Sequence, residues 1–379
     1  MINLDQWRPG VILVVFLGVV AAVLHAGLRP YDFFVPNQVS WSEGTPGLRF
    51  TRQGIAATSE SLEWFASGRA EPVSIEVWLR RGASPPADGG VVLALGDGER
   101  VAPLLLAQWQ SSFYFRFPAR DEGVLIEETL RLKDESPEEK RRFVAFTSGP
   151  EGSRAYVEAV EVASSVLSHF LGPGVRSLGG RLVLGSRLQA CRGWDGMVDG
   201  LALYRRALSL EEVASHAAVV GNGDVKALAG ERGLLALYAF DEGFGQRVRD
   251  LAGGAGDLSI PELYRPLDLG LLRFRPMAAG RPVTLDDAIV NVLGFIPVGL
   301  SALWALRRWT SLGGTSLFLI VTSIGFLLSL AIETTQAFLP SRVSAAGDLA
   351  LNGLGSALGA ALALAVSHKM LARWFGARR

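Results

Sequence analysis

The chain has 379 residues, 37 of them basic and 37 acidic, so its formal net charge is zero. This balance gives no electrostatic reason to expect a nucleic acid as partner. The single cysteine, Cys191, cannot close an intramolecular disulfide, and the four histidines lack metal-ligand spacing, which argues against zinc chemistry. Mean hydropathy is positive at +0.28, and the apolar excess lies at the two ends of the chain. The composition therefore favours a membrane protein with a mixed middle region.

The first predicted element is an apolar helix over Val11–Leu28, and with its flanks it makes up the first predicted region, residues 1–35. At about 1.5 Å per residue it is long enough to cross the hydrocarbon core. Trp7 and Arg8 precede it and Arg29 follows it, as is typical of membrane boundaries. The alternative is a cleaved signal peptide, although the cleavage site at Leu24 to Ala26 would be a poor one.

The middle region, 36–270, has many short apolar runs separated by clusters of Gly, Pro, Asp and Ser. The runs are 73–79, 113–117, 143–146, 155–162, 182–184, 198–204 and 234–240. Short alternating runs at this spacing predict an antiparallel β-sandwich. One helix is expected after Ser209, because Ser209 and Glu212 have the spacing of a capping box.

The run from Gly193 to Val213, with Gly-Met-Val-Asp-Gly-Leu and Tyr-Arg-Arg-Ala-Leu-Ser-Leu-Glu-Glu, resembles the closing signature of concanavalin-like, laminin G-type jelly rolls. Leu235–Leu258 looks like a segment usually found at the start of such domains, so we expect it to complete the sandwich as a permuted strand. The resemblance implies recognition of a glycan, or calcium at a loop rim. The weak candidates for a calcium site are Asp195, Asp199, Asp241 and Glu242, for which turn capping or solvent exposure is the alternative. The tryptophans that could stack on sugars, or else lie in the core, are Trp64, Trp78, Trp109 and Trp194. No other cofactor is expected.

Three further apolar spans are predicted in the region 271–379, at about 288–306, 314–338 and 349–371. The fold class is thus multidomain, with a four-span α-helical bundle and an all-β sandwich inserted between spans one and two. The positive-inside rule orients the chain, because Arg307 and Arg308 and the basic residues near both termini then share one face. We expect an inner (cytoplasmic) membrane protein with cytoplasmic termini and an extracytoplasmic sandwich.

Polar residues recur at helical spacing in these spans, and each falls toward the outer end of its helix. Such groups in lipid are usually turned inward and paired. The predicted cluster is Asp287, Asn291, Glu333, Gln336, Arg342, Asp348 and Asn352, with Arg342 as the central charge. The predicted helix-packing positions are Pro297, where a kink is expected, Gly299, Gly355 and Gly359.

This pattern resembles the VanZ-like family, named for a protein linked to teicoplanin resistance. The matching motifs are D-x3-N-x3-F-x-P-x-G from Asp287, E-x2-Q from Glu333 with P-x-R from Pro340, and D-x3-N-x2-G-x3-G from Asp348. The family implies an envelope role and leaves the biochemical activity open.

Three hypotheses for the polar cluster follow. It is a structural set of interhelical hydrogen bonds, or an outward-facing site for an envelope glycolipid, glycopeptide or lipid precursor. In the third, the chain is a membrane-embedded enzyme with Glu333 as acid or base. The expected partners are membrane lipid and envelope glycan or glycolipid.

Overall fold

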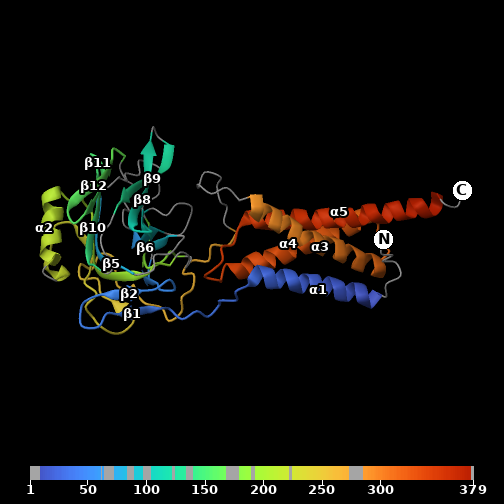
Figure 1. Cartoon of the computed structure of the whole chain (residues 1–379), viewed down its shortest axis with the longest axis horizontal. Coiled ribbons are helices and arrows are strands. Elements are labelled where there is room, and N and C mark those ends of the chain that lie inside the picture. Colours follow the sequence, from blue (N-terminus) through green and yellow to red (C-terminus); the bar gives the residue numbers. More distant parts are fainter. Residues whose placement is uncertain are drawn as a thin grey trace. The chain divides into compact units, whose positions relative to one another are not determined.

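A computed structural model of the chain shows two compact units, residues 34–268 and residues 1–33 with 269–379 (Figure 1). The structure describes residues 9–60, 62–63, 72–82, 89–96, 104–121, 124–133, 140–167, 179–188, 193–221, 224–272 and 285–376. Among these, it leaves out the side chains of residues 9, 62–63, 118–121, 124–126, 179, 219–221, 285–287 and 367–376.

The second unit, residues 1–33 with 269–379, is a helical bundle. Its helices are α1 (Pro9–Leu28), α3 (Leu285–Trp309), α4 (Gly314–Gln336) and α5 (Ala346–Gly376). Each contains a stretch long and apolar enough to cross a bilayer. The prediction of one apolar helix before the middle region and three after it is confirmed.

Helices α3 and α5 approach each other through glycine. A Cβ atom added at Gly299 would lie 2.0 Å from the carbonyl oxygen of Ser356, and one at Gly359 would lie 2.1 Å from that of Ile296. Gly355 is equally tight against α3. Only glycine leaves room for backbones this close. Pro297 lies inside α3, and the kink expected there stays a prediction.

The first unit, residues 34–268, is an antiparallel sandwich of two sheets in its described residues. One sheet has the order β1 (Val39–Trp41), β2 (Leu48–Phe50), β14 (Gly196–Tyr204), β5 (Val73–Arg81), β10 (Arg142–Gly149), β11 (Gly152–Val157) and β12 (Val160–Ser165), with β15 (Leu234–Tyr238) also paired to β14. The other has the order β16 (Arg247–Val248), β17 (Leu258–Ser259), β3 (Ala56–Thr58), β13 (Gly179–Leu184), β6 (Gly90–Gly96), β7 (Leu104–Trp109), β8 (Ser112–Asp121) and β9 (Val124–Leu132), with β4 (Leu62–Glu63) also paired to β13. The predicted sandwich is confirmed.

The main core fills the space between the sheets. Phe146 of β10 packs against Phe115 and Phe117 of β8, with ring centroids 5.1 and 5.0 Å apart. Trp194 and Phe50 are fully buried and lie 6.4 Å apart. These large side chains come from both sheets, as the alternation of inward-facing positions along each strand requires.

Helix α2 (Leu210–Gly221) covers the outer face of the first sheet and encloses a second, smaller core with Trp78 and Phe143. The predicted capping box starts this helix. The Ser209 hydroxyl accepts the N–H of Glu212 at 3.3 Å, and the Glu212 carboxylate accepts the N–H of Ser209 at 2.8 Å. A short 3-10 turn, η2 (Val225–Leu228), follows α2.

One predicted run differs in detail from the observed strands. The run over 155–162 is a hairpin, because Glu158 and Ala159 both have positive φ and turn the chain between β11 and β12. The segment after α2 completes the sandwich as expected, since β15 pairs with β14 and β17 pairs with β3.

Candidate functional site

Glu333 is the most deeply buried charged side chain described in the helical bundle. It lies near the end of α4 and is 2% exposed. Its Oε2 atom accepts the backbone N–H of Ala345 at 2.8 Å, just before α5 begins. This bond ties the end of α4 to the start of α5 and partly offsets the cost of placing a carboxylate in an apolar bundle.

The polar side chains of α5 bond to both neighbouring helices. Asn291 of α3 donates to Oδ1 of Asp348 at 3.0 Å, and Asn352 donates to the hydroxyl of Ser329 on α4 at 2.9 Å. Asp348 is also close enough to Glu333 for their charges to interact. We call Asn291, Ser329, Glu333, Asp348 and Asn352 the polar cluster. Within the described part of the chain, the buried Oδ1 atom of Asn352 has no hydrogen-bond partner.

Gln336 and Arg342 bind the end of α1 instead of this cluster. Gln336 donates to the carbonyl oxygen of Gly27 at 2.8 Å. Arg342 is exposed and donates from Nε and Nη2 to the carbonyl oxygen of Arg29, at 3.1 and 2.7 Å. The expectation that Arg342 is the centre of the cluster is therefore wrong for the described residues. The last carbonyls of a helix lack partners within it, and those of α1 take up these donors.

The bonds from α4 to α1 and among α3, α4 and α5 all lie at the same end of the bundle. The sequence therefore predicted one cluster at the correct end of the bundle, whereas the described residues form two separate sets of contacts there. The side chain of Asp287, in the first turn of α3, lies outside the described residues. Ser329 was missed, although its position one turn before Glu333 on the same face of α4 could have indicated it.

The four acidic candidates for a calcium site in the sandwich lie in different surroundings, and three of them bond to other residues of the protein. Asp199 is 1% exposed and forms ion pairs with Arg80 at 2.9 Å and Arg141 at 3.4 Å. Burial raises the pKa of its carboxyl, although both arginines oppose this.

The other three acidic candidates differ in their surroundings. Asp241 pairs with Lys226, and the Glu242 carboxylate accepts the N–H of Arg249 at 2.7 Å. Asp195 is half-buried. Across the described parts of the chain, no three His, Cys, Asp or Glu side chains are grouped to hold a metal ion.

The tryptophan candidates divide by burial. Trp78 and Trp194 are core residues, and Trp194 donates to the Gln108 side chain at 2.7 Å. Trp109 is 53% exposed at the end of β7, and its ring centroid lies 6.4 Å from that of Tyr114. Trp64 lies outside the described residues. Trp109 is thus the described candidate whose ring is accessible for stacking.

A buried ionisable pair lies under α2. Glu76 of β5 is fully buried, and both of its carboxylate oxygens are 3.0 Å from Nδ1 of His216. Burial raises the pKa of Glu76 despite the opposing effect of His216. Burial acts to lower the pKa of His216, but the hydrogen bond and charge of Glu76 outweigh it, so that pKa is raised. The folded pair therefore holds protons more tightly than ordinary Glu and His side chains do.

Comparison with known proteins gives two matches to families. Residues 258–367 match the VanZ/LLP1 family, and residues 53–214 match a laminin G-type family of the concanavalin A-like lectin/glucanases superfamily. A comparison with curated proteins gives no match.

Several solved structures are similar to part of the chain at low sequence identity. The receptor binding domain of botulinum neurotoxin D is 13% identical with a TM-score of 0.37, covering 50% of this chain and 48% of its own. The SAP-like pentraxin from Limulus polyphemus is 10% identical with a TM-score of 0.32, covering 48% of this chain and 80% of its own. A Trypanosoma rangeli sialidase is 14% identical with a TM-score of 0.37, covering 47% and 28%. The chain spans about half the length of the botulinum domain that it matches. It is a membrane protein that combines a VanZ-like domain with a concanavalin A-like, laminin G-type sandwich.

Proposed function

We propose that this protein belongs to the cell envelope and binds an envelope ligand at the polar cluster of its bundle. The ligand class is a glycolipid head group, a lipid-linked precursor or a glycopeptide. The sandwich recognises a glycan or protein at the membrane surface. The family matches and the apolar helices support the membrane and envelope part of this proposal.

The observation that carries the proposal is the environment of Glu333. Glu333 is 2% exposed, and its carboxylate accepts the backbone N–H of Ala345 and bonds with the hydroxyl of Ser344. Within the described residues no Lys or Arg forms an ion pair with it. A buried carboxylate with neutral donors only still lacks a compensating positive charge or a proton. An amine of a ligand would supply that charge.

The orientation is part of the proposal. Arg307 and Arg308 end α3, at the opposite end of that helix from Asn291. The positive-inside rule assigns that basic end to the cytoplasm, so the polar cluster would open to the outer face. The sandwich, inserted between α1 and α3, would then also be extracytoplasmic.

Two alternatives compete with ligand binding. The cluster is purely structural if its hydrogen bonds only fix the helices, as the Asn352–Ser329 contact does. It is an enzyme site if Glu333 transfers a proton during turnover of a lipid or glycan. The three hypotheses predict that a conservative substitution at Glu333 removes different properties: ligand binding, bundle stability or turnover.

Native mass spectrometry of the purified protein in mild detergent tests the proposal. We expect a co-purified lipid or glycan on the wild type and its loss from Glu333→Gln. Thr335→Val is the matched control, because the Thr335 hydroxyl is exposed and bonds to the preceding turn of α4. Retention of the bound species by Glu333→Gln would contradict ligand binding by this carboxylate, as would a wild type that carries none. Turnover of added lipid or glycan by the wild type would favour the enzyme.

Thiol labelling of intact cells tests the orientation. In a Cys191→Ser background, a cysteine at Phe244, which is 81% exposed in the sandwich, should react with an impermeant reagent. A cysteine at Leu312, between α3 and α4, should react only after the membrane is opened. The reverse pattern would place the sandwich in the cytoplasm.

A further inference from the structure

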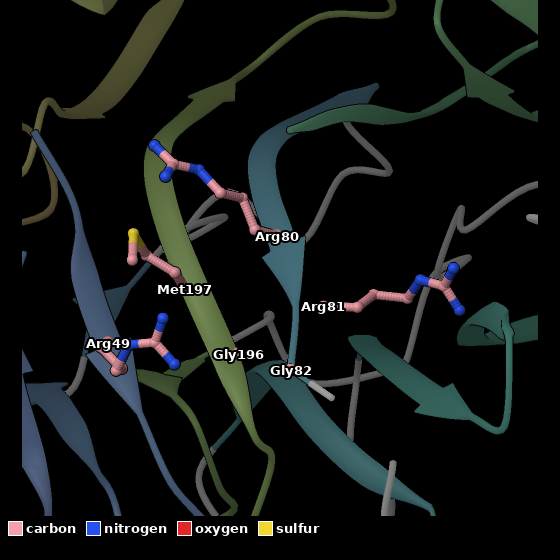
Figure 2. A pocket seen from close by; sticks show the side chains of 6 residues that line it. All are labelled: Arg49, Arg80, Arg81, Gly82, Gly196 and Met197. Carbon is pink, nitrogen blue, oxygen red and sulfur yellow. The ribbon is translucent and has the colours of Figure 1, made fainter. Parts of the chain in front are cut away.

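Arginines from neighbouring strands project from the outer face of the first sheet of the sandwich. Met197 of β14 lies opposite Arg49 of β2 on one side and Arg80 of β5 on the other. Residues paired across a sheet point to the same face, and the neighbours of Arg49, Leu48 and Phe50, lie in the core. Arg49, Met197 and Arg80 therefore share the outer face, while Arg81 projects to the opposite side (Figure 2).

Arg49, Arg80 and Met197 on the outer face border a small pocket of about 120 Å³. Its lining is Arg49, Arg80, Arg81, Gly82, Gly196 and Met197. The glycines cannot be replaced without a clash, because a Cβ atom at Gly82 would lie 2.5 Å from the Asp195 carboxylate and one at Gly196 would lie 2.2 Å from the Trp194 ring. The pocket has room for one small group rather than a whole sugar chain.

Asp199 holds one wall of the pocket in place. It accepts from Nε of Arg80 at 2.9 Å, and its side chain is 1% exposed. This contact uses one edge of the Arg80 guanidinium and leaves the two terminal amino groups as further donors. Arg49 is exposed and, among the described residues, forms no ion pair. Arg49 therefore adds positive charge that Asp199 does not pair with, and Asp195, which lies against Gly82, is a second carboxylate near the pocket.

We propose that this arginine pocket binds one anionic group, a phosphate or a carboxylate, carried by an envelope ligand. The planar guanidinium fork matches the oxygens of both groups and forms charge-assisted hydrogen bonds with them. Met197 gives the pocket an apolar side that suits the carbon skeleton bearing the anion. The inference rests on the recognition role proposed for the sandwich and adds its ligand chemistry, but it does not require the intramembrane site.

The test uses the full-length protein in a neutral detergent. The thermal unfolding midpoint, followed by tryptophan fluorescence, is measured against the concentration of inorganic phosphate or glucuronate, with sodium chloride at matched ionic strength as reference. A ligand that binds the folded state raises the midpoint, and the rise follows the logarithm of one plus the ligand concentration divided by Kd, so the concentration at which it begins reports the affinity. We expect at least one anion to raise the midpoint beyond the chloride reference, and the anion that does so at the lower concentration identifies the source as phosphate or carboxylate.

Variants locate the binding. Arg49→Gln changes an exposed residue and should weaken the apparent affinity about 10-fold or more, as expected for losing a hydrogen bond between charged groups. Arg247→Gln removes the same charge from an exposed position on the other sheet and should leave the affinity unchanged. Unchanged affinity in Arg49→Gln, equal loss in both variants, or no rise beyond the chloride reference with either anion would overturn the proposal. Glu333→Gln should bind the anion normally, so failure of the intramembrane proposal is distinguishable.

Discussion

The close approach of α3 and α5 predicts that Gly359→Ala destabilises the bundle. The new Cβ atom would lie 2.1 Å from the carbonyl oxygen of Ile296 and 2.9 Å from the nitrogen of Leu300, whereas ordinary contact begins at 3.4 Å. The helices must therefore separate by roughly 1 Å, a gap at which contacting atoms lose a quarter to a half of their dispersion energy. Several tens of atom pairs, each losing about 0.05 kcal/mol, give about 2 kcal/mol. This agrees with the ~1–3 kcal/mol typical of overpacked sites.

Helix propensity opposes this loss, since alanine is favoured over glycine in a helix interior by up to about 1 kcal/mol. Gly294→Ala isolates that contribution. Gly294 lies in α3, the partner helix of α5, but it is exposed and a Cβ atom there would meet nothing within 4 Å. The control should be neutral or slightly stabilising. The difference between the two variants, about 2 kcal/mol, therefore measures the packing alone.

Unfolding of the purified protein in mixed micelles of mild detergent and SDS, followed by circular dichroism at helical wavelengths, measures both variants. Far-ultraviolet ellipticity reports mainly on the helices of the bundle, because the other unit is largely β-structure. If Gly359→Ala unfolds at the same SDS fraction as Gly294→Ala, α3 and α5 separate without loss of stability, and their interface is not close-packed in the membrane protein.

Three more predictions concern buried polar groups. Glu333→Ala should cost about 1–3 kcal/mol of bundle stability, because the N–H of Ala345 loses its acceptor, whereas Glu333→Gln should cost less than ~1 kcal/mol. Equal losses in SDS unfolding would contradict this. Asp199→Asn should lower the free energy of unfolding of the sandwich by about 1–3 kcal/mol, measured by tryptophan fluorescence, and an unchanged midpoint would speak against a stabilising ion pair. Because the pKa values of Glu76 and His216 are both raised, the folded sandwich binds more protons than the unfolded chain, so its stability should fall as pH rises from about 5 to 8. Glu76→Gln should flatten this dependence in unfolding midpoints measured across that range, and an unaltered slope would assign it to other groups.

Much of the fold follows from local pattern. The alternation over 73–79 identifies β5, and the capping box at Ser209 fixes the start of α2. The turn at Glu158 and Ala159 escaped prediction because neither residue is a favoured hairpin residue. Local pattern fails most clearly at Glu76, because its place in the alternation of β5 indicates a residue that faces solvent. Only the remote helix α2 buries it, and a strand's own sequence does not show which face a distant element will cover.

The candidate site shows the same limit in the bundle. Helical spacing placed polar residues on common faces, and the described ones do gather at one end of the bundle. It did not predict which partner each would take. Arg342 was expected to seek carboxylates, but the carbonyl oxygen of Arg29 at the end of α1 accepts its donors. Backbone acceptors have no signature in the sequence, since every residue carries one.

The polar and glycine positions of α5 connect the structural and ligand-binding hypotheses, because both depend on the same helix. Asp348 and Asn352 bond to α3 and α4, and Gly355 and Gly359 follow on the same helix at steps of three and four. The glycines set the separation of α3 and α5, and the Asn291–Asp348 bond at 3.0 Å spans the same pair of helices about two to three turns away along α5. A substitution that increases the separation of α3 and α5 should therefore weaken the hydrogen bonds of the polar cluster as well. Stability and ligand retention are coupled readouts of one helix pair, so loss of both in Gly359→Ala would not distinguish the hypotheses, whereas loss of ligand alone in Glu333→Gln would.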